Sequence, residues 1–464
     1  MKKTLKDKVL VFLKEKKIVY VLVFALVARF IFWMIYVKNG GDGHMPDTDT
    51  YMLPAVSFFE EGNFGYTIRT PGYPLFLSLM MCFDREGYYG FTVVFQILMN
   101  VSAIYILYRL CKEFFTGEKY ALIAAGIASL NFLDMYYDCV IQSDSPAQTF
   151  LIVCVYFFVK FVKGLKEKKA YLRYIIPGAC ALVYAILLRP AFMYLPIAFL
   201  LGFSISAIVY RFVNVRFIVG LLCMVLICYI PMGCWSSHNR EYLGFDGYAY
   251  ISSYNLYMYN AAAVYAKQNG IGYNEACVVF QKGEDQVYQE YRMTMSEQEA
   301  QRKRGMELIK SDITYYLLQC LKGVAYLYVY PGVLDIDRVF GFGLEELKDE
   351  IKESGFSVGM IGKYFSEHWM AFLAMILDFI LLIAMTGVGI AGAVWLWKKD
   401  WIPAALLLGV LLYCTVVYCQ PVGAGAYCRF RISISMIISV FNLGFFALRC
   451  EKKNVNTAKK EKTA

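Results

Sequence analysis

The stretch 18-IVYVLVFALVARFIFWMIYV-37 decides the class of fold. It contains one charged side chain, Arg29, and a helix of about 20 apolar residues is long enough to cross a hydrocarbon core of ~30 Å. No small-residue cleavage site follows the run, so we expect it to stay in the protein as a first membrane span rather than act as a signal peptide.

Similar apolar runs recur along the 464 residues, of which 59% are hydrophobic and 18% charged, whereas a soluble domain has about 25% charged residues. We therefore expect an all-α polytopic membrane protein with about ten transmembrane helices. The expected spans lie near 18–37, 90–110, 120–137, 146–163, 174–188, 191–210, 216–235, 369–397, 402–419 and 430–448.

The lysines predict the orientation, because cytoplasmic loops are enriched in Lys and Arg. Lysines gather before the first span, in the loop at 160–173, at Lys398 and Lys399, and in the tail. We therefore expect a multi-pass protein of the cell membrane with both termini cytoplasmic. The net charge of +9 follows from these loops, and nucleic acid is not an expected partner.

This orientation predicts four regions and two large extracytoplasmic loops that carry interfacial helices. They are a transmembrane module at 1–235 with a first outer loop at 38–89, an outer loop region at 236–368, C-terminal helices at 369–450, and a disordered tail at 451–464. The segment 313–331 is almost long enough to span. A crossing there would place the C-terminal lysines outside, so we expect an interfacial helix.

The first outer loop contains 46-PDTDTYMLPAVSFFEEGNFGYTIRTPGYPLFL-77. Asp47 and Asp49 could cap a helix, be solvated, or bind a cation. The turn that follows, Arg69-Thr70-Pro71-Gly72-Tyr73-Pro74, is rigid and fixes Arg69 beside the membrane. A carboxylate and a fixed guanidinium at a membrane surface suit a lipid-borne substrate that carries phosphate.

Other charged residues lie at the ends of apolar runs. Arg189 interrupts a run that is otherwise apolar from 174 to 210, and a charge at such a depth is costly unless it is paired or functional. Arg429 and Arg431 stand at the outer end of the last span. Asp144 is either an ordinary helix start, in Ser143-Asp144-Ser145-Pro146, or a second functional acid.

These residues carry a resemblance to a known family. The pattern Asp47-x-x-x-Tyr51-x-x-x-Ala55, then Arg69-x-Pro71-x-Tyr73-Pro74, resembles the first outer loop of GT-C membrane glycosyltransferases, in particular the protein O-mannosyltransferase and aminoarabinose-transferase superfamily. Three further stretches resemble positions of the same family: Ser143-Asp144, Leu188-Arg189-Pro190 and Tyr427-x-Arg429-Phe430-Arg431. Asn239-Arg240 has the family's two residues in reversed order, and residues 260–365 match nothing in it.

The resemblance implies an inverting transferase that uses a polyprenyl-phosphate-linked sugar and acts on a protein, lipid or envelope glycan. It implies Asp47 as the general base, with Asp49 as an open alternative and Asp144 as a supporting acid. The implied substrate-binding residues are Arg69, Tyr73, Arg189, Arg240, Arg429 and Arg431.

We expect no cofactor and no metal, because His44, His238 and His368 are widely separated. The alternatives are a related polymerase or ligase that uses a diphosphate-linked oligosaccharide, and a lipid or solute transporter. Transporters place ionisable residues near the bilayer midplane and show repeated halves, whereas these acids gather in outer loops. The 14 cysteines lie mostly in apolar runs, and a disulfide that involves Cys277 or Cys234 stays open.

Overall fold

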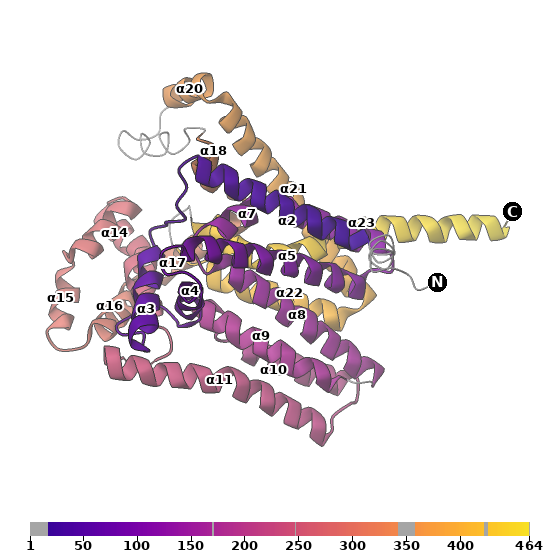
Figure 1. Cartoon of the computed structure of the whole chain (residues 1–464), viewed down its shortest axis with the longest axis horizontal. Helices are drawn as coiled ribbons and strands as arrows, with labels where there is room; N and C mark the ends of the chain where they lie inside the picture. Colours follow the sequence, from indigo (N-terminus) through magenta and orange to yellow (C-terminus); the bar gives the residue numbers. More distant parts are fainter. Residues whose placement is uncertain (1–16, 169–170, 246, 342–357, 422–425, 464) are drawn as a thin grey trace.

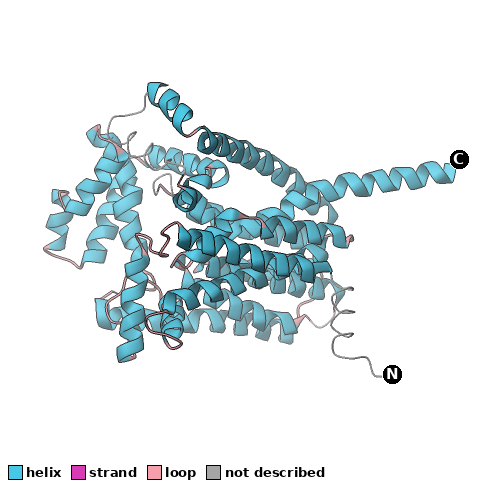
Figure 2. Cartoon of the chain, turned by 45° about the horizontal axis from the view of Figure 1, so that its top comes forward, coloured by secondary structure: helices cyan, strands magenta, loops and turns pink. Residues whose placement is uncertain are grey.

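The computed structural model describes residues 17–168, 171–245, 247–341, 358–421 and 426–463. The described chain is helical throughout and contains no strand (Figure 2). Eight helical segments are long and apolar enough to cross a membrane: Lys17–Lys38 (α2), Tyr88–Phe114 (α5), Asp144–Glu167 (α8), Pro190–Val209 (which includes α10, Leu195–Val209), Val215–Leu243 (α11), Trp369–Lys399 (α21), Trp401–Tyr418 (α22) and Ala426–Ala447 of α23. These segments confirm the all-α polytopic class.

Shorter helices stand at the other two positions where we expect spans. Residues 120–137 fall into α6 (Glu118–Ser129) and α7 (Phe132–Cys139). The expected span at 174–188 is α9 (Ile175–Leu188), which follows a 3₁₀ turn, Leu172–Tyr174. Asn131 separates α6 from α7, and its side chain caps α7 by accepting from the amides of Leu133 and Asp134. The count of ten spans stays a prediction.

Both ends of the bundle can be followed in Figure 1, where α2 begins at the end of the bundle at which α23 ends. The opposite end carries the helices of the two predicted outer loops. The first loop forms α3 (Thr48–Glu61) and α4 (Gly72–Met81). The second forms α12 (Tyr250–Asn255), a π-helical turn η3 (Leu256–Ala261), α13 (Ala262–Asn269), α14 (Tyr273–Lys282), α15 (Gln286–Arg292), α16 (Glu297–Ser311), α17 (Ile313–Val329), α18 (Val333–Phe340) and α20 (Val358–Glu367).

The proline turn of the first loop packs directly on the bundle. A Cβ added at Gly72 would lie 2.5 Å from the backbone carbon of Leu187, so only glycine lets α4 begin against the end of α9. Behind this contact, Tyr73 and Leu77 are fully buried in the main core. The turn therefore fixes the first loop to the helix end that carries Arg189.

Two details concern the C-terminal part. Asp378 in α21 accepts hydrogen bonds from the amides of Gly332 (2.8 Å) and Val333 (3.3 Å), so this acid caps the start of α18. α23 continues to Thr463, through the tail that we expect to be disordered. Ala, Lys and Glu make up much of that segment, and all three favour helix.

Candidate active site

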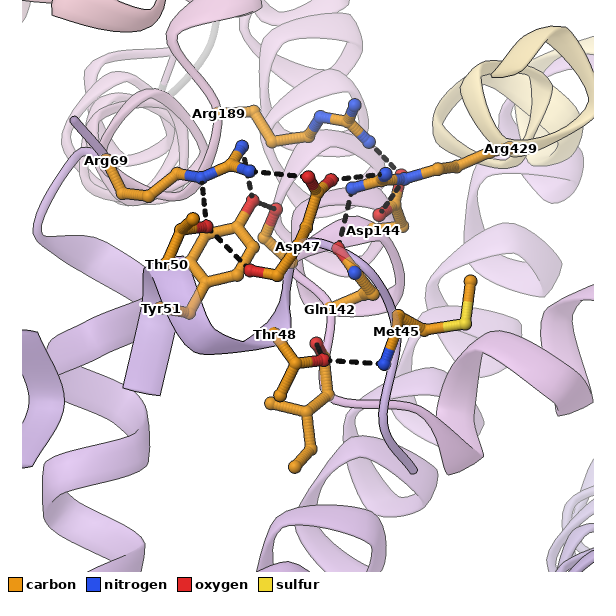
Figure 3. A network of polar contacts seen from close by, with 12 residues as sticks. Met45, Asp47, Thr48, Thr50, Tyr51, Arg69, Gln142, Asp144, Arg189 and Arg429 are labelled. Carbon is orange, nitrogen blue, oxygen red and sulfur yellow. Dashed lines mark hydrogen bonds and ion pairs between the residues drawn. The ribbon is translucent and has the colours of Figure 1, made fainter. Parts of the chain in front are cut away.

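Five charged side chains from distant parts of the sequence meet at the end of the bundle that carries the outer-loop helices (Figure 3). Asp47 precedes α3, and Asp144 is the first residue of α8. The three arginines are Arg69 before α4, Arg189 after α9, and Arg429 in the first turn of α23. All five were predicted site residues, and the structure brings them together.

The five residues form a continuous chain of alternating charges. Arg69 Nη2 lies 2.8 Å from Asp47 Oδ1, and Arg429 Nη1 lies 2.7 Å from Asp47 Oδ2. Arg429 Nε lies 2.8 Å from Asp144 Oδ2, and Arg189 is ion-paired with the other oxygen of Asp144. We call this set of five residues the arginine–carboxylate cluster. It holds three guanidinium groups and two carboxylates, so it carries a surplus of positive charge.

The backbone brings Asp47 to the segment before α8. The amide of Ile141 donates to the carbonyl of Gly43 at 2.9 Å, and Thr48 Oγ1 donates to the carbonyl of Ile141 at 3.3 Å. These bonds lay the first outer loop along residues 140–144. Asp47 thereby comes within reach of Arg429, which also donates to Gln142 Oε1 at 2.6 Å.

Neighbouring polar groups orient Arg69. Its Nε donates to Thr50 Oγ1 at 2.7 Å, and its guanidinium carbon lies 4.5 Å from the ring centre of Tyr51. The hydroxyl of Tyr51 bonds Ser143 Oγ at 3.1 Å. The motif Asp47-x-x-x-Tyr51 therefore places one side chain in the cluster and the other beneath Arg69, one helical turn apart.

Exposure differs across the cluster. The side chain of Asp144 is fully buried, whereas that of Asp47 is 33% exposed. Burial opposes the ionisation of Asp47, but the charges of Arg429 and Arg69 and their hydrogen bonds outweigh it and lower its pKa to about 2. Asp47 is thus an ionised carboxylate that a substrate can reach, and Asp144 is an anchor behind it.

The other predicted site residues lie elsewhere. Asp49 pairs with His44 at 3.2 Å, and its side chain is 73% exposed. Arg431 donates to the carbonyl oxygens of Leu327 (3.3 Å) and Tyr330 (2.9 Å) at the end of α17. Arg240 is exposed in the last turn of α11.

Tyr73 supports the cluster from below. Its ring meets that of Tyr51 edge to face at 5.1 Å, and its hydroxyl donates to Gln96 Oε1 at 2.8 Å. Gln96 in turn donates to the carbonyls of Asp138 (2.9 Å) and Val140 (3.0 Å). Since Tyr73 is fully buried, it holds the segment 138–144 in place and is not open to a substrate.

A second polar set, which the sequence analysis did not identify, lies inside the bundle. Arg29 Nε lies 2.9 Å from Asp138 Oδ2, and both side chains are fully buried. Arg29 also donates to Asn100 Oδ1 at 2.8 Å, and Ser145 Oγ donates to the carboxylate of Asp138. We call Arg29, Asn100, Asp138, Ser145 and Gln148 the buried polar layer.

The buried polar layer connects to the cluster at two points. Ser145 directly follows Asp144, and Gln148 Nε2 bonds the carbonyl of Ile432 (2.9 Å) and Ser435 Oγ (2.8 Å) in the helix that carries Arg429. The signal that could have revealed this layer is Arg29 in an apolar run, together with Asn100 one helical turn after Gln96 and Gln148 one helical turn after Ser145.

The geometry of the cluster does not suit a metal ion. Among the described residues, no group of three or more His, Cys, Asp or Glu side chains is placed to hold a metal ion. Arg429 occupies the position between the carboxylates of Asp47 and Asp144. A divalent cation that bridged these two acids would have to displace the guanidinium.

Comparison with known proteins bears on the fold. Residues 69–235 match the family described as dolichyl-phosphate-mannose-protein mannosyltransferase. The fold is similar to that of the oligosaccharyltransferase AglB from Archaeoglobus fulgidus in complex with an inhibitory peptide and a dolichol-phosphate, with a TM-score of 0.52 and 13% identity over 97% of this chain. The chain has a GT-C fold.

The GT-C fold recurs in the apo structure of the Archaeoglobus fulgidus oligosaccharyltransferase, with a TM-score of 0.51 and 13% identity over 96% of this chain. The chain spans 52% of the length of each of these structures. No curated protein matches it by sequence. The matched family segment contains Arg69, Asp144 and Arg189, whereas Asp47 and Arg429 join the cluster from outside it.

Proposed function

We propose that this protein is a membrane glycosyltransferase that moves a sugar from a polyprenyl-phosphate carrier to a protein, lipid or cell-envelope glycan. The arginine–carboxylate cluster carries this proposal. It lies at the ends of helices, where the phosphate of a lipid-linked donor would meet the protein while its chain stays between the spans. The match of residues 69–235 to a dolichyl-phosphate-mannose-dependent family supports the donor class.

The donor phosphate would bind the surplus positive charge of the cluster. Guanidinium groups form forked, charge-assisted hydrogen bonds with phosphate oxygens. Arg69 and Arg189 stand at the two ends of the cluster, and each of them is ion-paired with one carboxylate there. A phosphate could therefore take over part of their hydrogen bonding while Arg429 keeps the two acids apart.

Asp47 is the proposed general base. A carboxylate with a pKa of about 2 is a weak base while two guanidinium groups face it. When a phosphate draws on Arg69, Asp47 loses part of that compensation and its pKa rises. We therefore expect donor binding itself to strengthen the base.

The reaction would be a direct displacement. The acceptor hydroxyl or amine attacks the anomeric carbon through an oxocarbenium-like state, the bond from that carbon to the phosphate oxygen breaks, and Asp47 takes the acceptor proton. The polyprenyl phosphate leaves with the bonding electrons, and the arginines stabilise its charge. This displacement would invert the anomeric centre and use neither a cofactor nor a resident metal.

The active site would face the outside of the cell membrane. Lys160, Lys163 and Lys166 lie at the end of α8, whose other end carries Asp144, and Lys398 and Lys399 end α21, whose other end follows the outer-loop helix α20 (Figure 1). Since such segments prefer the cytoplasm, the cluster would lie on the extracytoplasmic side. Lipid-linked sugars that reach that side are the donors we expect.

The proposal is tested by transfer from radiolabelled donors into membranes. The panel contains several polyprenyl-phosphate sugars and one polyprenyl-diphosphate oligosaccharide, and the proteins are wild type, Asp47→Asn and Asp49→Asn. We expect transfer from a monophosphate donor, and a loss of roughly 10²- to 10⁴-fold in Asp47→Asn. Asp49→Asn is the matched control, because its carboxylate faces His44 outside the cluster.

Other results would change the assignment. Transfer from the diphosphate donor alone would favour an oligosaccharide ligase. A loss of transfer in Asp49→Asn with a normal Asp47→Asn would name Asp49 as the base. No transfer from any donor in membranes that contain folded protein would favour a transporter.

A further inference from the structure

Helix α17 crosses the outer end of α22 at very close range. Tyr328 Oη and Thr415 Oγ1 lie 2.8 Å apart. Further along the same contact, a Cβ added at Gly323 would lie 2.0 Å from the carbonyl oxygen of Cys419. Only glycine allows the two backbones to touch there, so the position of α17 on Cys419 is tightly defined.

This contact brings two thiols together. Cys320 precedes Gly323 by three residues, so both lie on the same face of α17. The side chains of Cys320 and Cys419 interact with each other across this contact, and the Cys419 thiol donates to the carbonyl of Val416 at 3.2 Å. Cys320 is half-buried and Cys419 is buried, so a small reagent would reach Cys320 first.

The local chemistry favours thiol–disulfide exchange. The interaction with Cys419 lowers the pKa of the Cys320 thiol to about 7 against the opposing effect of burial, with a smaller contribution from the Tyr316 hydroxyl. A thiol with a pKa near the ambient pH is the best attacking group in exchange. The cysteines that the sequence analysis considered differ: Cys277 is buried among aromatic rings, and Cys234 is exposed on α11.

We propose that Cys320 and Cys419 form a reversible disulfide that fastens α17 to the start of the segment leading into α23. The Cys320 thiolate attacks an external disulfide, such as oxidised glutathione or that of a thiol oxidase, and releases one thiolate. The Cys419 sulfur, losing its proton, then displaces the second. The two cysteines lose two protons and two electrons, and the external disulfide is reduced to two thiols.

The disulfide would stabilise a junction next to the arginine–carboxylate cluster. Gln420, which follows Cys419, accepts from Asn260 Nδ2 at 2.9 Å, and its carbonyl accepts from the hydroxyl of Tyr427 at 3.0 Å. Tyr427 lies two residues before Arg429. The cross-link would thus tie together α17, the π-helical turn η3 and the first turn of α23.

The test uses the full-length protein in its own membranes. One sample is treated with oxidised glutathione and one with a reducing agent; both are alkylated with N-ethylmaleimide, digested and analysed by mass spectrometry. We expect a linked peptide pair that contains Cys320 and Cys419 in the oxidised sample, and separate alkylated peptides in the reduced one. The exposed Cys234 should be alkylated in both.

A second measurement keeps the test independent of any one variant. After purification, oxidation should raise the apparent Tm of the wild type by roughly 5 °C and leave that of Cys320→Ser unchanged. The proposal is overturned if N-ethylmaleimide still alkylates both thiols after oxidation, if Cys320 links to another cysteine, or if the Tm rises equally in Cys320→Ser. None of these readouts depends on the donor or on transfer activity.

Discussion

Two arginine–aspartate systems adjoin each other in this protein, and they differ in how far they are closed to solvent. In the buried polar layer, the side chains of Arg29 and Asp138 are fully buried, and Asn100 with three backbone carbonyls completes the hydrogen bonding of the guanidinium. In the arginine–carboxylate cluster, Asp47 is 33% exposed and three guanidinium groups share two carboxylates. The same side-chain chemistry is closed in one system and open in the other.

The difference separates two roles. A closed, charge-balanced pair in an apolar bundle has nothing to offer a ligand, and breaking it leaves an uncompensated buried charge. An open set with surplus positive charge can exchange its internal ion pairs for an anionic substrate. We infer that the buried polar layer positions the segment 138–148 and that the arginine–carboxylate cluster binds an anionic substrate.

The largest effect is expected from breaking the closed system. Asp138→Leu leaves the charge of Arg29 unpaired in the bundle, and this should lower the free energy of unfolding by about 3–5 kcal/mol. The measurement is thermal unfolding in one detergent. Adding Arg29→Met to Asp138→Leu should restore most of the loss, because the double variant removes both charges of the pair. Equal losses in the single and double variants would contradict the role of the pair.

A smaller effect is expected from the open system, where two arginines of one helix can be compared. Arg429→Gln removes the bonds to both carboxylates and should lower kcat/KM for the donor roughly 10²- to 10³-fold. Arg431→Gln removes bonds to the α17 carbonyls and should lower the Tm while the KM for the donor stays the same. Equal changes in the donor KM of the two variants would contradict a donor-binding role that belongs to Arg429 and not to Arg431.

The closed and open systems also differ in how far the sequence predicted them. Asp47, Arg69, Asp144, Arg189 and Arg429 were predicted, because charges at the ends of apolar runs are conspicuous and their order resembles a known family. Asp138, Asn100 and Gln148 were missed, since a single amide or acid in a helix gives no sign of which partner it meets. Arg29 stood out as the one charge in its apolar run, but its partner Asp138 is 109 positions away.

Fold class was predictable for a similar reason, and span number was not. About twenty apolar residues in a row predict a membrane-spanning helix by length alone, as in α2. The segment 118–139 is apolar enough to suggest one span, yet Asn131 caps a second helix within it. Similarly, Arg431 and Arg429 are two residues apart and indistinguishable by composition, but one side chain points to α17 and the other to the carboxylates.

The smallest expected effect concerns the acid limit of the open system. The pKa of Asp47 is lowered from 3.8 to about 2, so its ionisation stabilises the fold fully above about pH 4, and this contribution is lost as the pH falls through 2. Between pH 5 and 8 this group should therefore leave stability unchanged.

Arg69→Gln removes one of the two charges that lower the pKa of Asp47, so the acid limb of transfer activity should move up by roughly one pH unit. The control is Arg85→Gln, whose guanidinium pairs with Glu60 on the surface. Superimposable acid limbs for wild type and Arg69→Gln would mean that Asp47 is not the group whose protonation stops the reaction.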